Sequence, residues 1–119
     1  MAESEANIQR RIQLALSEAG CLIWRNETAG VWLGKPVHSE GNTVTLAHAR
    51  HMTAGLCVGS SDLVGCCPRG RLLCVEVKTP RGRVSAEQRT FIDAVNAAGG
   101  IAGVCRSVEE ALTLVQTSA

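Results

Sequence analysis

Glu76 and Lys78 stand two residues apart in the apolar, β-branched segment Cys74-Val75-Glu76-Val77-Lys78. Because successive side chains of a strand point to opposite faces, Val75 and Val77 are expected on one face and Glu76 and Lys78 on the other. The ordinary explanation of this pattern is a sheet with one solvated face that carries an ion pair. For a Glu-x-Lys motif alone, that explanation is favoured.

Asp62 changes this balance, because a predicted β-hairpin brings it beside Glu76. Strands over 61–67 and 71–79 flank the turn sequence Pro68-Arg69-Gly70. Pairing around this turn opposes residues whose numbers sum to about 138, so Asp62 falls opposite position 76 and two like charges lie side by side. Such a pair is destabilising unless a cation sits between the carboxylates. Two hard oxygen ligands, a strand carbonyl and water suit Mg²⁺.

Asp62, Glu76 and Lys78 together indicate metal-assisted hydrolysis of a phosphodiester. A bound Mg²⁺, or Mn²⁺ in its place, would polarise the phosphate and lower the pKa of a bound water. Lys78 would orient that water or neutralise charge in the transition state. This role suits the compact charge and tunable pKa of a lysine.

The remaining sequence predicts one α/β domain over residues 1–119 that would position these side chains. Apolar stripes predict helices over 4–19, after Ser85 and after Ser107, the last two with capping boxes. Further short strands are predicted over 21–25 and 101–105. Residues 26–56 are the least readable part and are predicted to form a loop or irregular hairpin with a possible strand over 43–47. The expected order is α-β-(loop)-β-β-α-β-α.

Composition excludes several classes of protein. Hydrophobic residues make up 45% of the 119, which excludes a disordered chain. No apolar run approaches the roughly 18 residues that a membrane span needs, and the acidic start of the chain does not resemble a secretory signal. Six cysteines without a C-x-x-C motif favour a reducing, cytoplasmic location. With a formal net charge of +1, any contact with nucleic acid must come from a local cluster of basic residues.

Three motifs in order resemble the VRR-NUC branch of the PD-(D/E)XK nuclease superfamily. They are G-x-S-D-L-V-G at 59–65, V-E-V-K-T at 75–79 and R-G-R-V-S-x-x-Q-x-x-F at 81–91. The resemblance covers nearly the whole chain. One departure is Ser61, where the superfamily often has proline before the aspartate. The resemblance implies a restriction-endonuclease-like mixed β-sheet flanked by helices. It also implies that the protein is of the stand-alone type found in phage and bacteria.

The resemblance also implies roles for individual residues. Asp62, Glu76 and the main-chain carbonyl of Val77 would bind the metal, and Lys78 would be the catalytic lysine. Gln88, in the first turn of the following helix, would point back toward the site.

Gln88 and Glu5 each have an ordinary structural alternative. Gln88 is also the expected capping partner of Ser85, and one side-chain orientation is not expected to serve both roles. Glu5 resembles the superfamily's N-terminal acidic residue, which contacts the metal directly or through water. A carboxylate is also simply favourable in a first helical turn. Gln9, one turn further along, could extend the site.

DNA is the expected partner, contacted through its phosphates by a local group of arginines. The first candidates are Arg81, Arg83 and Arg89 after the catalytic strand and Arg10 and Arg11 on the first helix, with Arg25, Lys35, Arg50 and His51 as further candidates. The resemblance implies cleavage of branched DNA such as Holliday junctions. Because such substrates have two-fold symmetry and the chain is short, a homodimer is expected.

Two rival hypotheses remain at this point. One is a non-catalytic DNA-binding or assembly module that kept the fold, although such a module would be free to lose Asp62, Glu76 or Lys78. The other concerns the metal: His48 and His51, with His38 or Cys57, could form a zinc site, but their spacing fits no recognisable zinc motif.

Overall fold

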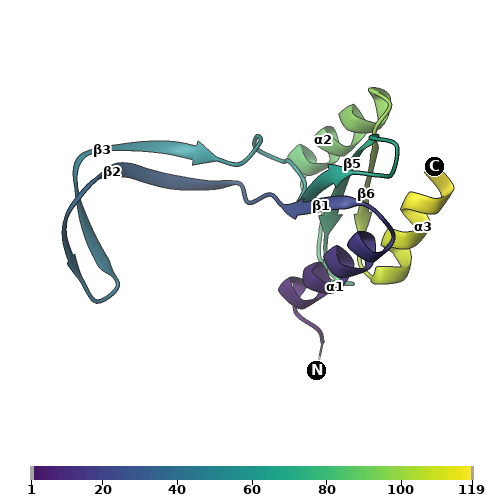
Figure 1. Ribbon diagram of the computed structural model, residues 1–119, viewed down its shortest axis with the longest axis horizontal. Coiled ribbons are helices and arrows are strands. Elements are labelled where there is room, and N and C mark those ends of the chain that lie inside the picture. The colour runs from purple at the N-terminus through teal and green to yellow at the C-terminus, as the bar shows by residue number, and fades with distance from the viewer. Residues whose placement is uncertain (1, 119) are drawn as a thin grey trace.

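The computed structural model describes residues 2–118, which form a three-layered body and a long projecting hairpin (Figure 1). The middle layer is a four-stranded sheet in the order β1-β4-β5-β6. Helices α1 (Glu5–Glu18) and α3 (Val108–Ser118) cover one face of the sheet and α2 (Ala86–Ala97) the other. The predicted α/β class and mixed sheet are confirmed, because β5 pairs parallel to β6 and antiparallel to β4. The strands of this sheet are β1 (Leu22–Arg25), β4 (Leu63–Cys66), β5 (Leu72–Val77) and β6 (Ile101–Cys105).

The first helix forms as its apolar stripe predicts. Ser4 is the N-cap, and its side-chain oxygen accepts a hydrogen bond from the backbone N–H of Asn7. Ile8, Ile12 and Leu16 are buried against the sheet. The helix therefore contributes one continuous apolar face to the core.

From Leu73 onward, strand β5 is buried on both faces. Val75 and Val77 pack in the core beneath α1 and α3, while Cys74 packs with Val64 and Ile92 beneath α2. The solvated face that a Glu-x-Lys motif alone would favour is therefore not what the structure shows. The α2 layer covers that face, which is the usual environment of a central strand with a parallel neighbour.

The hairpin of β4 and β5 has the predicted register. Leu63 pairs with Val75 and Cys66 with Leu72, and both pairs of numbers sum to 138. Asp62 directly precedes β4, and Glu76 is the penultimate residue of β5. Both acidic residues consequently lie at the same end of the sheet.

Residues 26–56 form a long hairpin, which we call the arm. Its strands are β2 (Ala29–Glu40) and β3 (Thr43–Ala54), each 12 residues long. Two register shifts, after Leu33 and after Pro36, interrupt the pairing. The prediction of an irregular hairpin is thus confirmed, but its strands extend far beyond the single strand expected over 43–47. The segment written as a loop in the expected order of elements therefore contains two strands.

The two predicted capping boxes differ in outcome. Ser85 and Gln88 form a complete box at the start of α2. At the start of α3, the Ser107 side chain accepts the Glu110 N–H, but the Glu110 carboxylate accepts from the backbone N–H of Arg106 rather than that of Ser107. The second box is therefore only half formed.

All six cysteines are free thiols. Among residues 2–118, no helix combines the length and apolarity needed to cross a membrane.

Two adjacent leucines at the start of β5, one buried and one exposed, allow the burial of the core to be tested by substitution. Leu73 is 0% exposed and Leu72 is 46% exposed. Leu73→Ala is expected to lower the free energy of unfolding by about 2–5 kcal/mol, because it leaves a cavity. Leu72→Ala should cost clearly less. Urea denaturation of both variants measures the difference, and equal losses would contradict the burial described here.

Candidate active site

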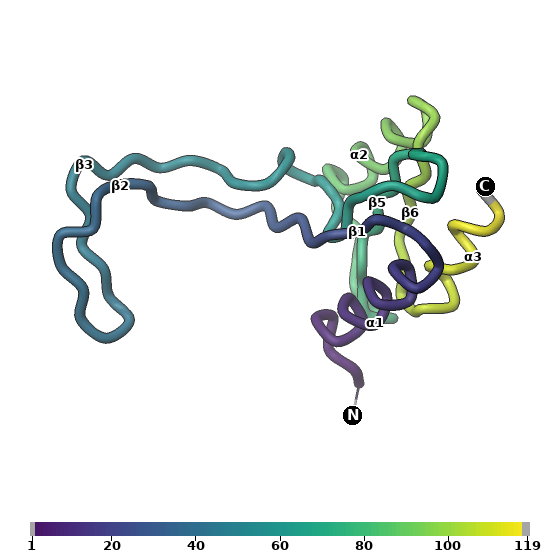
Figure 2. The backbone as a smooth tube through the Cα atoms, viewed as in Figure 1, coloured from purple at the N-terminus to yellow at the C-terminus, as the bar shows by residue number. Residues whose placement is uncertain are grey.

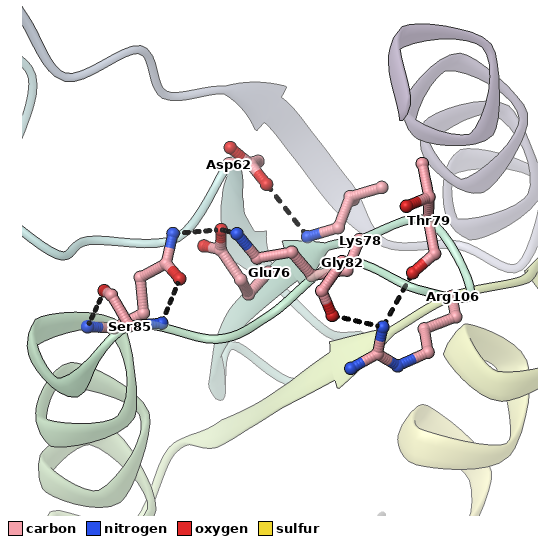
Figure 3. Close-up of polar contacts among 9 residues, drawn as sticks. Asp62, Glu76, Lys78, Thr79, Gly82, Ser85 and Arg106 are labelled. Atoms are coloured by element: carbon pink, nitrogen blue, oxygen red, sulfur yellow. Dashed lines mark hydrogen bonds and ion pairs between the residues drawn. The ribbon is translucent and has the colours of Figure 1, made fainter. Parts of the chain in front are cut away.

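Asp62 and Glu76 converge at the end of the sheet where β4 begins and β5 ends (Figure 3). The Asp62 Oδ2 atom accepts a hydrogen bond from the backbone N–H of Val77 at 2.9 Å. This bond fixes the Asp62 carboxylate against β5, one residue beyond Glu76. The predicted juxtaposition of the two carboxylates is what the structure shows.

The Glu76 carboxylate is almost completely enclosed. The residue is 2% exposed, and its Oε1 atom accepts a hydrogen bond from Gln88 Nε2 at 2.7 Å. The Lys78 ammonium lies 3.9 Å from the same oxygen. The other oxygen, Oε2, is buried and has no hydrogen-bond partner among the described residues. A buried carboxylate oxygen without a partner is costly, so this atom requires an explanation.

The electrostatics of Glu76 favour its neutral form. Burial, with a further contribution from the neighbouring Asp62 carboxylate, raises the pKa of Glu76 to about 8, although the Lys78 ammonium opposes the rise. A charged group placed close to both carboxylates would remove this strain. A divalent cation is such a group.

Gln88 serves both of the roles that the sequence analysis treated as exclusive. Its Oε1 atom accepts the backbone N–H of Ser85 at 2.9 Å, which completes the capping box. Its Nε2 atom donates to Glu76 in the same orientation. The expectation that one orientation could not serve both is wrong, because the two ends of the amide face different partners. The helix cap thereby positions the donor that holds Glu76.

The donor chemistry fits a hard cation such as Mg²⁺. The two carboxylates supply oxygen ligands, which Mg²⁺ prefers, and one of these oxygens is the unpartnered Glu76 Oε2. Within residues 2–118, no group of three or more His, Cys, Asp or Glu side chains could hold a metal ion. A cation here would therefore complete its shell with backbone carbonyl, water and substrate oxygens, as Mg²⁺ commonly does.

The same finding bears on two other expectations about metal ligands. Glu5 begins α1, which packs on the opposite face of the sheet from α2, and among the groups that raise the pKa of Glu76 its charge contributes least. The structure does not bring it in as a third direct ligand. The histidines and Cys57 of the rival zinc hypothesis likewise form no cluster in the described chain, so that hypothesis is not supported.

A basic loop follows the site, and Arg106 holds it in place (Figure 3). The Nη1 atom of Arg106 donates to the carbonyl oxygens of Thr79 at 2.6 Å and Gly82 at 2.8 Å. Arg81 and Arg83 in this loop are exposed, and their side chains make no hydrogen bond or ion pair within residues 2–118. The loop is therefore fixed while its arginines remain available. Sequence analysis missed Arg106, because its partners are backbone atoms of a distant segment.

The predicted arginines of α1 are already engaged with neighbours. Arg11 donates to both carboxylate oxygens of Glu3, at 2.8 and 2.6 Å, and Arg10 donates to the Asn7 side chain. Arg89 is exposed in the first turn of α2, beside the site. The structure thus places Arg81, Arg83 and Arg89 on the elements that follow Lys78, and Arg10 and Arg11 on a separate helix.

Asn26, which sequence analysis missed, ties the arm to the segment that carries Asp62. Its backbone N–H donates to the Asp62 carbonyl at 2.7 Å, and its side chain donates to the Ser60 hydroxyl and the Ser61 carbonyl at 2.8 and 2.9 Å. Its Oδ1 atom accepts the N–H of Leu56, from the returning end of the arm. A cleft of about 500 Å³ lies here, with Asn26, Asp62 and Gln88 in its lining. The base of the arm is therefore one wall of the candidate site.

Comparison with known proteins gives a family and a fold. The family model described as the VRR-NUC domain matches residues 4–109. A solved structure titled "VRR_NUC domain" is similar to this chain, with a TM-score of 0.58 and 19% identity over 94% of each chain. At this identity, the likeness shows the fold alone. No curated protein matches the chain significantly.

The raised pKa of Glu76 predicts a pH-dependent stability in the absence of divalent cations. Between the unfolded value of 4.5 and the folded value of about 8, the unfolded chain releases a proton that the folded chain keeps. The contribution of Glu76 to the free energy of unfolding is therefore fully present below pH 4.5 and is lost as pH rises toward 8. Glu76→Gln should remove this fall, measured by urea denaturation in EDTA across the range. The exposed control Glu18→Gln should follow the parent chain, and an unchanged slope in Glu76→Gln would contradict the assignment.

Proposed function

This chain belongs to the VRR-NUC family, and from that premise we propose that it is a divalent-metal-dependent nuclease that hydrolyses phosphodiester bonds in DNA. The family's nuclease-type fold supports the general activity. The observation that carries the proposal is the pair of converging carboxylates, Asp62 and Glu76, with a buried unpartnered oxygen and the Lys78 ammonium beside it.

The mechanism assigns a task to each residue of the site. Asp62 and Glu76 would hold Mg²⁺ or Mn²⁺, with the Val77 carbonyl as a third ligand and Glu5 contributing through water. When bound, the cation would act as a Lewis acid toward the scissile phosphate and lower the pKa of a water. Lys78 would orient the attacking water and neutralise charge that develops on the phosphate.

Gln88 would act as a positioning residue in this mechanism. Its hydrogen bond to Glu76 Oε1 leaves Oε2 as the oxygen without a protein partner. Because Gln88 is itself held by the backbone N–H of Ser85, the Glu76 carboxylate has its orientation fixed before any ligand arrives. A preorganised carboxylate needs little rearrangement on binding a cation.

DNA would be held mainly through its phosphates. Arg81 and Arg83 lie three and five residues after Lys78 in the loop that Arg106 fixes, and Arg89 follows on α2. Exposed guanidinium groups on a fixed loop suit bidentate contacts with phosphate oxygens. Arg10 and Arg11 could add contacts only by exchanging their present partners.

Branched DNA such as a Holliday junction is the substrate that we propose, with a homodimer as the acting form. A four-way junction has two-fold symmetry, and two copies of one short chain match it with one active site for each strand to be cut. The alternative of a non-catalytic DNA-binding module is disfavoured, because it has no use for the costly burial of Glu76 beside Asp62.

Replacing the lysine separates cleavage from binding. Lys78→Ala is expected to lower Mg²⁺-dependent cleavage of a labelled four-way junction by about 10²-fold or more, because charge stabilisation in the transition state is lost. Binding measured by gel shift in Ca²⁺ should be largely kept. Arg69→Gln, in the turn at the far end of the sheet, is the matched control and should cleave normally. Normal cleavage by Lys78→Ala would show that the site is wrongly assigned.

The two loop arginines predict a salt-dependent loss of DNA binding. Arg81→Gln combined with Arg83→Gln should weaken binding to duplex and junction alike and lower the slope of log K against log salt by about 2, or about 1 for each lost phosphate contact. Fluorescence anisotropy at several salt concentrations measures this slope. A slope equal to that of the Arg69→Gln control would place the DNA elsewhere on the surface.

A further inference from the structure

Asp62 lies in a loop, although the candidate metal site depends on where its carboxylate points. Residues 55–62 have no regular secondary structure, and β4 begins only at Leu63. Loop residues are generally more mobile than the strands and helices that they connect. A loop carboxylate that must stay beside Glu76 therefore needs a support other than the ladder of the sheet.

Asn26 holds the peptide groups on both sides of Asp62. Its backbone N–H donates to the Asp62 carbonyl at 2.7 Å, and its Nδ2 atom donates to the Ser61 carbonyl at 2.9 Å. These two carbonyls belong to the planar peptide groups that flank the Asp62 Cα atom. Because both planes are held, the backbone angles of Asp62 are fixed. One residue thus sets the direction in which the Asp62 side chain leaves the backbone.

The remaining hydrogen bonds of the Asn26 amide hold the same loop. Its Nδ2 atom also donates to the Ser60 hydroxyl at 2.8 Å, and its Oδ1 atom accepts the backbone N–H of Leu56 at 3.2 Å. An asparagine amide offers two N–H donors and one acceptor oxygen, whereas an alanine side chain offers none. Both donors are used within the chain, so the Asn26 side chain acts on the loop rather than on a ligand.

The place of Asn26 at the base of the arm makes this support more important. Both ends of the arm join the body near β1, as Figure 2 shows. Among the described residues, β2 and β3 pair only with each other, so the sheet of the body does not hold them. Any movement of so long a hairpin would pull on the neighbouring loop. Because Asn26 bonds the loop and the returning end of the arm together, it isolates Asp62 from such movement.

We propose that Asn26 is a positioning residue of the metal site, which orients the Asp62 carboxylate toward Glu76 and thereby raises the affinity for a divalent cation. The Val77 N–H holds one end of the Asp62 side chain, at Oδ2, and Asn26 holds the backbone at the other end. A carboxylate that is fixed at both ends needs little rearrangement to bind a cation. The inference rests on the proposed function, because it requires that Asp62 and Glu76 bind the cation.

Asn96 provides a matched control, because it makes the same kind of bonds away from the site. Its Nδ2 atom donates to the Ala102 carbonyl at 2.9 Å, and its Oδ1 atom accepts the Ala102 N–H at 2.9 Å. Ala102 lies near the start of β6, whereas the site lies where β5 ends, beside Cys105. Loss of the Asn96 side chain should therefore lower the stability of the fold and leave the site intact.

Binding of Mn²⁺ without DNA tests the proposal apart from cleavage. Asn26→Ala is expected to weaken Mn²⁺ binding by about tenfold, measured by the EPR signal of free Mn²⁺, because an outer partner that orients a metal ligand is lost. Asn96→Ala should bind Mn²⁺ as the parent chain does. Equal affinity in Asn26→Ala and the parent, or an equal loss in both variants, would overturn the inference alone. A parent chain that binds no Mn²⁺ would overturn the proposed function as well.

Hydrogen exchange of the Val77 backbone N–H reports the position of the Asp62 carboxylate without any metal. In EDTA, Asn26→Ala should speed this exchange about threefold or more relative to that of the Val75 N–H, because the bond to Asp62 is weakened. Asn96→Ala should leave the ratio unchanged.

Ser60→Ala supplies a milder variant, because it removes only one acceptor of the Asn26 amide. Its Mn²⁺ affinity and its Val77 exchange should both fall between those of the parent chain and Asn26→Ala. Should Asn26→Ala not fold, Ser60→Ala still decides the matter. Parent-like values of both quantities in Ser60→Ala would then overturn the inference.

Discussion

The site depends on one unfavourable interaction, the burial of the Glu76 carboxylate beside that of Asp62. Burial alone raises the pKa of Glu76, and the second carboxylate adds to the rise. The surrounding structure pays for this arrangement with fixed hydrogen bonds. The Val77 N–H holds Asp62, and the Gln88 amide holds Glu76. After these bonds are formed, one buried oxygen of Glu76, Oε2, still has no hydrogen-bond partner among the described residues. The cation site that we propose would account for all of these features together.

Each layer of the fold contributes to holding this pair of carboxylates. The antiparallel register of β4 and β5 brings them to one end of the sheet, and the parallel strand β6 closes the other side of β5. Helix α2 covers the face on which Glu76 lies and delivers Gln88 from its first turn. Arg106, which follows β6, holds the basic loop by its carbonyl oxygens. The residues that we propose for catalysis and for DNA contact are thus fixed by the same few elements.

The sequence predicted those parts of the molecule whose geometry is local. The turn at Pro68-Arg69-Gly70 sets the register that opposes positions 62 and 76, and the capping box of Ser85 and Gln88 marks where α2 begins. The long strands of the arm were not foreseen, because a ribbon without a core shows no clean alternation of apolar and polar residues. Asn26 and Arg106 were missed because they bond mainly to the backbone of distant segments, and such contacts have no motif.

The most direct test is the pKa of the Glu76 side chain, measured by ¹³C NMR of the labelled carboxyl group with and without divalent cation. In EDTA the pKa should lie near 8. Saturating Mg²⁺ should bring it well below the ordinary value of a glutamate, because the cation stabilises the carboxylate form. A pKa that is ordinary in EDTA, or one that Mg²⁺ leaves unchanged, would contradict the account of this site.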